Sequence, residues 1–407
     1  MTSTSVPLGP APGAGPLAGM RVLDLSAYIA GPYGCTLLAD MGAAVIKIEP
    51  PGGDNLRKYP STLASESRAF MGVNRGKQGL ALDLKKPEAL EVLHRLLAEA
   101  DVLVHNFRPS VPDRLGIGYQ QLRERYPRLV YCALTGYGDT GPLKDKAGFD
   151  QVLQTMTGLC TLQGPAGGPP EIVYGSVVDY YGASMLAMAI CAALVERGRN
   201  GLGQYVGVSL LRSALAMQSA RLVWAEGEGR DVGRDMRSGG ITGLHPAKDG
   251  SYLYLSANTP HFWRALCERT GLDDLATDPR CDSVRKRAQN AEHIVPRLRE
   301  ALQRHTALEW EALFGEAVPC AAARAVEDMF DHPQVQAEGL IEDMEHPVAG
   351  RYRGFAHPVQ FGSTPGPKPL PPPTFGQHAA DILAAHGYSD EQIARLRALD
   401  ALPEKMA

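Results

Sequence analysis

The sequence predicts an α/β protein: a parallel sheet alternating with helices, followed by a smaller α+β unit and a returning C-terminal segment. Three observations carry this prediction. Residues 20–49 follow a strand–helix–strand order within about 30 residues, which is the repeating unit of a parallel sheet. Residues 80–134 continue the alternation. The composition then changes at 226–237, a charged and glycine-rich stretch that is typical of a domain boundary.

Length and composition narrow the class of protein. A chain of 407 residues is too long for one ordinary core, so we expect two domains. Hydrophobic residues make up 44% of the chain and charged residues 21%, as in soluble globular proteins. The net charge of −4 gives no reason to propose nucleic acid or a membrane surface as a partner. The longest charge-free apolar run, 180–195, is shorter than the roughly 20 residues that a membrane span needs.

The cysteines and the N-terminus indicate a compartment. Seven cysteines are scattered without a CxxC pair, which argues against both a disulfide framework and a zinc site. We therefore expect a cytoplasmic protein with no metal site. Residues 1–18 are rich in Pro, Gly, Ser, Thr and Ala, and they lack a basic region and an apolar run. We interpret them as a disordered tail rather than a signal peptide.

The elements of the first α/β part follow from local patterns. Short apolar runs indicate buried strands, and apolar residues at i, i+3 and i+4 indicate helices. Gly31 and Pro32 break the chain before the first helix, and Gly42 ends that helix. On this basis we expect strands at 20–25, 44–49, 80–84, 101–107 and 129–134, and helices at 33–41, 87–100 and 119–126.

The later elements complete the domain prediction. A glycine-rich turn at 135–142 follows a strand, at the edge where open α/β sheets bind ligands. Further helices are expected at 150–158, 262–269, 294–303, 308–317, 378–385 and 390–399, and further strands at 204–211 and 250–257. We therefore predict a tail at 1–18, the N-terminal part of a large domain at 19–225, a small α+β domain at 226–325 and a return segment at 326–407.

The stretch 175–197 holds one carboxylate, Asp179, directly before about four turns of small and apolar residues. Two interpretations are open at this point. Asp179 is either an N-cap that accepts hydrogen bonds from the free N–H groups of a buried helix, or a reactive group whose charge the helix N-terminus stabilises. The local pattern alone favours the N-cap.

Two further patterns bear on nucleotide binding. The strand 44–49 ends in Glu49, which invites a dinucleotide-binding interpretation with the acid on a ribose, but the GxGxxG fingerprint is missing and Pro32 stands in the turn. The segment up to residue 77 also carries clustered bases. These form either a solvated surface or a patch that holds phosphates. They are Arg57, Lys58, Arg68, Arg75 and Lys77.

Taken together, the motifs resemble those of the family III CoA-transferases, a group that contains formyl-CoA transferase and the related α-methylacyl-CoA racemases. The resemblance covers residues 16–402, and it depends on the order of the motifs, since each one alone is weak. They stand at 22–32 (VLDL…AGP), 38–54 (LADMGAAVIKIEPPGGD), 74–77 (NRGK), 82–85 (LDLK), 101–109 (DVLVHNFRP), 114–116 (RLG), 136–142 (GYGDTGP), 175–197 and 375–378 (FGQH).

The resemblance implies that Asp179 is a nucleophile. Its carboxylate would attack an acyl-CoA thioester, pass through a mixed anhydride and end as an aspartyl-CoA thioester, and an acceptor acid would then reverse the sequence. An anhydride hydrolyses in water, so such a site has to be dry. Small residues beside Asp179, among them Gly175 and Gly182, would let a thioester approach.

The resemblance also implies which residues hold CoA. Bases would bind its phosphates, and aromatic rings would pack on its adenine or pantetheine. Gly239 and Gly240 would belong to a mobile loop over the nucleophile. The implied CoA-binding residues are Ile29, Ala30, Asn74, Lys77, Asn106, Phe107, Arg114, Leu115, Tyr137 and Gly138.

Two departures from the family pattern affect the reaction. The racemases need a proton-shuttling His next to Asp, where this chain has Phe149-Asp150, so transfer is favoured over racemisation. Formyl-CoA transferase carries a glutamine where this chain has Ile29, which suggests a different acid pair, such as one containing the dicarboxylate succinate. The alternatives are a racemase or epimerase, a CoA-binding protein without catalysis and, least favoured, a nicotinamide dehydrogenase.

Fold and assembly follow from the same resemblance. It implies a large Rossmann-like domain built from both chain ends, a small domain inserted between them, and two chains interlocked as a homodimer. CoA and acyl-CoA would be substrates, and no permanently bound cofactor is expected.

Overall fold

The computed structural model describes residues 14–63, 66–164, 168–229 and 240–407. The chain divides into a large unit, Met1–Ala225 with Gln334–Ala407, and a small unit, Glu226–Pro333. The large unit therefore takes in both chain ends. The return to it comes at Gln334 rather than at residue 326, because a 3-10 helix at Val326–Phe330 belongs to the small unit.

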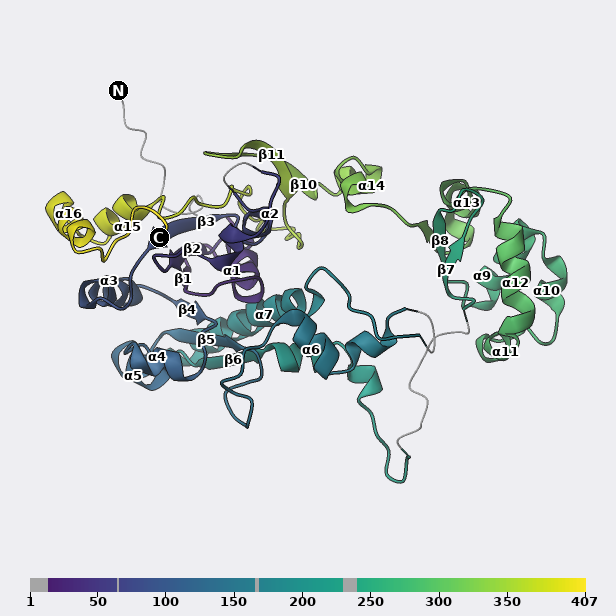
Figure 1. Cartoon of the computed structure of the whole chain (residues 1–407), viewed down its shortest axis with the longest axis horizontal. Coiled ribbons are helices and arrows are strands. Elements are labelled where there is room, and N and C mark those ends of the chain that lie inside the picture. The colour runs from purple at the N-terminus through teal and green to yellow at the C-terminus, as the bar shows by residue number, and fades with distance from the viewer. Residues whose placement is uncertain (1–13, 64–65, 165–167, 230–239) are drawn as a thin grey trace. The chain divides into compact units, whose positions relative to one another are not determined.

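The large unit is built on a six-stranded parallel sheet in the order β3-β2-β1-β4-β5-β6 (Figure 1). The strands are β1 (Arg21–Asp24), β2 (Ala44–Glu49), β3 (Lys77–Ala81), β4 (Val102–His105), β5 (Val130–Thr135) and β6 (Tyr205–Ser209). The order reverses between β1 and β4. The α/β prediction is confirmed, although β3 begins three residues before the predicted strand at 80–84.

Helices cover both faces of this sheet (Figure 1). Along β5, Val130, Cys132 and Leu134 face one core while Tyr131 and Ala133 face the other, because successive side chains of a strand point to opposite faces. The first core includes residues of α1 (Ala30–Asp40), α7 (Val177–Asn200) and α8 (Leu210–Ala216). The second includes residues of α3 (Pro87–Leu97), α5 (Tyr119–Arg125), α15 (Ala379–Ala385) and α16 (Asp390–Ala398).

Helix α1 begins earlier than predicted. Gly31 and Pro32 lie in its first turn rather than before it, because the N–H that proline lacks has no partner within the first turn of a helix. Gly34 lets α1 lie directly on α7, since a Cβ there would come within 2.8 Å of Leu186 Cδ2.

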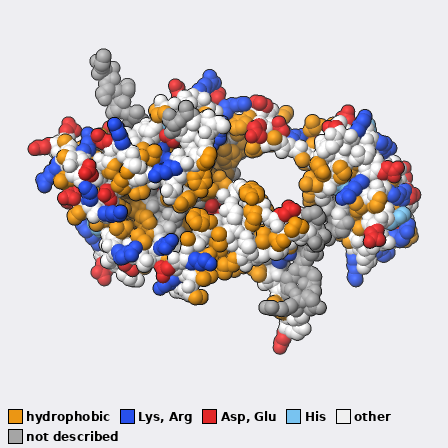
Figure 2. Space-filling model, in the orientation of Figure 1, with side chains coloured by type: hydrophobic (Ala, Val, Ile, Leu, Met, Phe, Trp, Pro, Cys, Tyr) orange, Lys and Arg blue, Asp and Glu red, His pale blue; other side chains and the backbone are white. Residues whose placement is uncertain are grey.

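Helix α7 is also longer than its apolar run, at 24 residues. Within the described part of the chain, α7 is long and apolar enough to cross a membrane. Core helices of soluble proteins meet the same two criteria of length and hydropathy. Helix α7 packs against α1, α6 (Asp150–Met156), α8, β5 and β6. On the face of the molecule in Figure 2, Lys and Arg side chains are interspersed with Asp and Glu.

The C-terminal return covers the β3 edge of the sheet. His378 N–H donates to Gly79 O over 2.9 Å, and Gly79 N–H donates to His378 Nδ1 over 3.0 Å. Residues 14–18, which we placed in the tail, form a turn in which Leu17 N–H donates to Met41 O over 2.8 Å. Residues 1–13 lie outside the described part of the chain.

The remaining elements of the large unit are short. They are α2 (Arg68–Val73), α4 (Ser110–Arg114), the antiparallel pair β10 (Ile341–His346) and β11 (Gly350–Phe355), and 3-10 helices at Asn55–Lys58, Leu159–Leu162 and Ser219–Arg221; α14 (Pro333–Ala337) starts at the boundary.

The small unit packs helices against an antiparallel sheet in the order β7-β8-β9. Its core holds Trp263, Trp310 and Phe314, which are each at most 3% exposed. Its elements are β7 (Gly243–Pro246), β8 (Tyr252–Leu255), β9 (Cys320–Ala322), α9 (Pro260–Thr270), α10 (Asp273–Thr277), α11 (Val284–Gln289), α12 (Ala291–Leu302), α13 (Ala307–Phe314) and 3-10 helices at Gly315–Ala317 and Val326–Phe330.

A set of buried ion pairs joins the carboxyl ends of β1 and β2 and the start of β3. Lys77 Nζ lies 2.8 Å from Asp24 Oδ2, and Lys47 Nζ lies 2.9 Å from Asp54 Oδ2, with all four side chains at most 1% exposed. Burial alone would raise the pKa of Asp24, but the ammonium groups of Lys77 and Lys47 outweigh it and lower that pKa to about 2. The Asp24 carboxylate is therefore held as an ion inside the fold.

We expect Lys47→Met to lower the free energy of unfolding by about 3–5 kcal/mol, because it leaves the buried Asp54 carboxylate without its counter-charge. Urea unfolding followed by far-UV circular dichroism measures the loss. Lys85→Met removes the same charge from an exposed position and should change stability by no more than about 0.5 kcal/mol. Equal stabilities of the two variants would contradict a structural role for the buried pair.

Candidate active site

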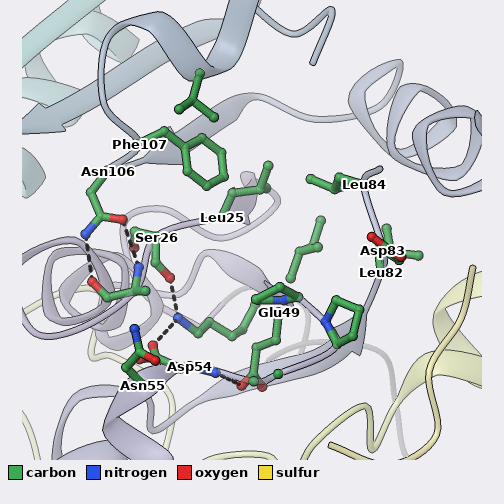
Figure 3. A pocket seen from close by; sticks show the side chains of 18 of the residues that line it. Leu25, Ser26, Glu49, Asp54, Asn55, Leu82, Asp83, Leu84, Asn106 and Phe107 are labelled. Carbon is green, nitrogen blue, oxygen red and sulfur yellow. Dashed lines mark hydrogen bonds and ion pairs between the residues drawn. The ribbon is translucent and has the colours of Figure 1, made fainter. Parts of the chain in front are cut away.

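A cavity of about 920 Å³ opens at the carboxyl edge of the sheet, where the strand order reverses (Figure 3). Its wall comes from the segments that follow β1, β2, β3 and β4, and from α4. Its volume is within the range of small-molecule sites. In Figure 3 the apolar side chains of Leu25, Leu84 and Phe107 lie on one side of it, and the polar groups of Asp54 and Asn55 on another.

Four of the predicted CoA-binding residues line this cavity: Asn106, Phe107, Arg114 and Leu115. The amide of Asn106 fixes the loop after β1, since Oδ1 accepts from Ala27 N–H over 2.9 Å and Nδ2 donates to Ala27 O over 2.7 Å. Phe107 stacks on His105 with ring centroids 5.3 Å apart. The Arg114 side chain is exposed, so its charge is available to a ligand.

Asn74 and Lys77 do not line the cavity. Lys77 Nζ also donates to Pro32 O over 2.7 Å and to Asn74 Oδ1 over 2.8 Å, so its ammonium is fully engaged within the fold. Asn74 is 0% exposed and donates from Nδ2 to Phe70 O. Both side chains are bonded within the fold in this structure, and their role toward CoA stays a prediction.

The five clustered bases separate in the same way. Arg57 and Arg75 are buried beside Glu49 and Asp40, and Lys77 beside Asp24, whereas Lys58 and Arg68 are exposed. Lys58 lines the cavity. Lys85 lines the cavity as well, although we had not predicted a role for it. The LDLK motif, which follows a strand, was the feature of the sequence that could have indicated it.

The other predicted CoA contacts lie away from the cavity wall. Ile29 immediately precedes α1 and Ala30 is its first residue, next to Tyr28, which does line the cavity. Tyr137 is 7% exposed and belongs to a hydrophobic core, and Gly138 N–H donates to Thr135 Oγ1 over 3.0 Å. Their roles toward CoA stay predictions.

Gly239 lies outside the described residues. Gly240 has φ of 87° and belongs to the small unit, so the loop role also stays a prediction.

Glu49 is not free to bind a ribose. Both of its oxygens accept from Arg57 over 2.8 Å, and Oε2 also accepts from Asp54 N–H over 2.9 Å. The strand order matches that of dinucleotide-binding folds, but the acid that would contact the ribose is already paired.

Asp179 stands in the first turn of α7 and is not its N-cap. The N-cap is Ser176, which has a left-handed backbone (φ 59°) and makes no hydrogen bond to the helix through its side chain. The free N–H groups of Val178 and Asp179 instead donate to Asp150 Oδ2, over 2.6 and 3.0 Å. The capping role that the local pattern predicted for Asp179 therefore belongs to Asp150 on α6, which accepts these hydrogen bonds.

The Asp179 carboxylate has no hydrogen-bond partner in the part of the chain that the structure describes. Burial, and then the negative charge of Asp150, raise the pKa of Asp179 to about 7. We expected the helix N-terminus to stabilise the charge, but these two effects outweigh it. A carboxylate with such a pKa is more basic, and hence more nucleophilic, than an ordinary aspartate.

One aromatic contact links the cavity to α6. The Tyr28 ring meets the Phe149 ring edge to face, with centroids 5.6 Å apart, and Phe149 directly precedes Asp150. Tyr28 has φ of 66°, an uncommon backbone conformation for a bulky residue, and its N–H donates to Asp54 Oδ1 over 3.1 Å. The local sequence carried no sign of this strained residue.

Among the described residues, no group of three or more His, Cys, Asp or Glu side chains could hold a metal ion. The seven cysteines are free.

Comparisons with known proteins identify the family. The model of CoA-transferase family III matches residues 17–379. Human succinyl-CoA:glutarate CoA-transferase is 31% identical over 388 residues, which cover 94% of this chain and 88% of that protein. Acetyl-CoA:oxalate CoA-transferase of Acetobacter aceti is 35% identical over 354 residues, covering 84% of this chain and 88% of that protein.

A solved structure agrees with these relatives. That of Rv3272 from Mycobacterium tuberculosis aligns with a TM-score of 0.79 at 32% identity, over 90% of this chain and 99% of that chain. An acyl-CoA thioester and a carboxylic acid are the substrates that such relatives imply. The chain belongs to CoA-transferase family III and is an enzyme of that type.

Proposed function

We propose that this enzyme moves CoA between two carboxylic acids through a thioester formed on Asp179. The observation that carries the proposal is the Asp179 carboxylate itself, which is partly buried, has no hydrogen-bond partner among the described residues and has a pKa raised to about 7 by burial and by Asp150. A buried catalytic carboxylate that is left unbonded is suited to attack a carbonyl carbon.

The reaction balances without a cofactor. One Asp179 oxygen attacks the thioester carbonyl of the donor, which gives a mixed anhydride and releases CoA as a thiolate. The thiolate attacks the Asp179 acyl carbon, giving an aspartyl-CoA thioester and the free donor carboxylate. The acceptor carboxylate then attacks this thioester, and the thiolate, released again, attacks the acceptor's acyl carbon. New acyl-CoA leaves, and the Asp179 carboxylate is regenerated.

We assign the cavity at the carboxyl edge of the sheet to part of CoA. Arg114, Lys58 and Lys85 supply exposed positive charge for phosphates, and Phe107 with the neighbouring apolar wall suits the adenine or the pantetheine arm. Relatives named for succinate, glutarate and oxalate support a small dicarboxylate as one of the two acids.

We further propose a cytoplasmic homodimer. The free cysteines support a reducing compartment. Helix α7 leaves Met188 and Val195 each 59% exposed, and such apolar side chains are suited to contact a second copy of the chain.

Asp179→Ala should lower the rate of CoA transfer by at least about a thousandfold, because no other group replaces the nucleophile. Mass spectrometry of transfer from succinyl-CoA to glutarate measures the rate, and hydroxylamine should modify only the peptide that holds Asp179. Glu196→Ala, an exposed site at the far end of α7, is the matched control and should keep full activity. Appreciable transfer by Asp179→Ala would exclude this mechanism.

The rate of the first half-reaction should fall about tenfold for each pH unit below about 7 and level off above it, because only the ionised Asp179 attacks. Single-turnover loss of succinyl-CoA without an acceptor, from pH 5 to 9, measures this dependence, with circular dichroism to show that the protein stays folded. A midpoint near 4, the value of an ordinary aspartate, would contradict the raised pKa.

Arg114→Met should raise the dissociation constant of CoA about tenfold, the effect of one lost charge-assisted hydrogen bond. Isothermal titration calorimetry with free CoA measures it. The control is Arg123→Met, which removes an exposed arginine on α5, outside the cavity wall. Equal affinities of the two variants would place the phosphates of CoA elsewhere.

A further inference from the structure

A buried glutamine on α6 forms hydrogen bonds both to the segment before α7 and to Asp150, the acid that caps α7. Gln154 is 0% exposed. Its side chain donates from Nε2 to Val173 O over 2.9 Å and accepts at Oε1 from Val173 N–H over 3.0 Å, so both backbone groups of Val173 are held. Gln154 Nε2 also donates to Asp150 Oδ1. One amide therefore positions both the incoming chain and the Asp150 carboxylate.

Asp150 completes the connection to α7. It stands one turn before Gln154 on α6, is 2% exposed, and uses its second oxygen for the N–H groups of Val178 and Asp179. Its charge is thus stabilised by three N–H donors. Ser176, in its left-handed conformation, offers no side-chain hydrogen bond to the same helix end.

We propose that Gln154 and Asp150 are a positioning pair. Asp150, held by Gln154, accepts the free N–H groups at the start of α7, so the Asp179 carboxylate stays unbonded beside the negative charge of Asp150. This inference rests on the proposed role of Asp179 as the nucleophile. Were Asp179 itself the cap, its oxygens would be taken up by backbone N–H groups, and hydrogen bonds to a carboxylate lower both its pKa and its reactivity.

In the part of the chain that the structure describes, Asp150 is the charged group that acts on the pKa of Asp179. Asp150 faces it from α6, and Tyr180 follows it on α7. Tyr33 on α1 meets Tyr180 with ring centroids 4.8 Å apart, and Arg75 lies 5.8 Å from the Tyr33 centroid but is paired with Asp40. Asp150 is accordingly the charge expected to control the titration of Asp179, and removing that charge should move the titration toward lower pH.

The test compares Asp150→Asn, which removes the charge but keeps the shape, with Asp150→Glu, which keeps the charge. The control is Gln151→Leu, on the same helix and with no side-chain hydrogen bond in the described structure. Asp150→Asn should shift the pH midpoint of the first half-reaction down by about one unit or more, while Asp150→Glu and Gln151→Leu keep it near 7. An unchanged midpoint in Asp150→Asn would overturn the proposal.

A second measurement needs no catalysis. Since the folded-state pKa of Asp179 is raised, ionisation of this residue destabilises the fold as pH rises from about 4 to about 7. The melting temperature of Asp179→Asn relative to its parent should therefore rise across this window, and Asp150→Asn should move the upper end of the window to lower pH. If Asp179→Ala retained transfer while this shift occurred, only the proposed function would fail. If Asp179→Ala were inactive and no shift occurred, only the positioning pair would fail.

The contribution of Gln154 is tested by a double-mutant cycle. Gln154→Met should slow the first half-reaction about tenfold or more in the parent but less than about twofold in the Asp150→Asn background, because Gln154 acts through Asp150. The KM for acyl-CoA should stay unchanged. Additive losses would mean that Gln154 only stabilises the fold, and would overturn its place in the pair.

Discussion

The carboxyl edge of the sheet depends on charges that are buried and paired inside it. Asp24 ends β1 and pairs with Lys77, which begins β3. Lys47 lies within β2, pairs with Asp54 and donates to Ser26 O in the loop after β1. Removing one member of a buried pair leaves an uncompensated charge, so the segments that carry these residues are constrained together. The wall of the large cavity is built from the same segments. The buried ion pairs therefore help to hold the wall of the cavity in place.

Two aspartates lie near the start of α7, and their environments differ. Asp150 accepts from three N–H donors, while Asp179, whose own backbone N–H is one of them, keeps its carboxylate unbonded in the described structure. A helix N-terminus favours negative charge, but here the N–H groups of Val178 and Asp179 donate to Asp150 rather than to the Asp179 carboxylate. The acid that caps this helix and the acid whose pKa is raised are therefore two different side chains.

Much of this could be predicted from the chain. Alternating apolar runs indicated the α/β fold, and the ordered motifs placed Asn106, Phe107, Arg114 and Leu115, which share one cavity. Lys77 shows the limit: a lysine in a loop-like, basic segment indicates a surface, and only the packing of β3 beside β2 brings it to Asp24. The capping role of Asp150 was hidden for a related reason, because an acid supplied from another helix leaves no local pattern.

The two hydrogen bonds between Gly79 and His378 have a consequence for synthesis of the protein. Strand β3 lies at the sheet edge, and the C-terminal residues that bond to this edge, Leu370 and His378, are synthesised well after β6. At roughly 5–20 residues per second, about 8–34 s separate the emergence of β6 from that of His378. Throughout that interval the nascent sheet carries an unpaired parallel edge, the surface that other strands join most readily. We expect β3 to be open to pairing with other strands until the C-terminal segment has been synthesised.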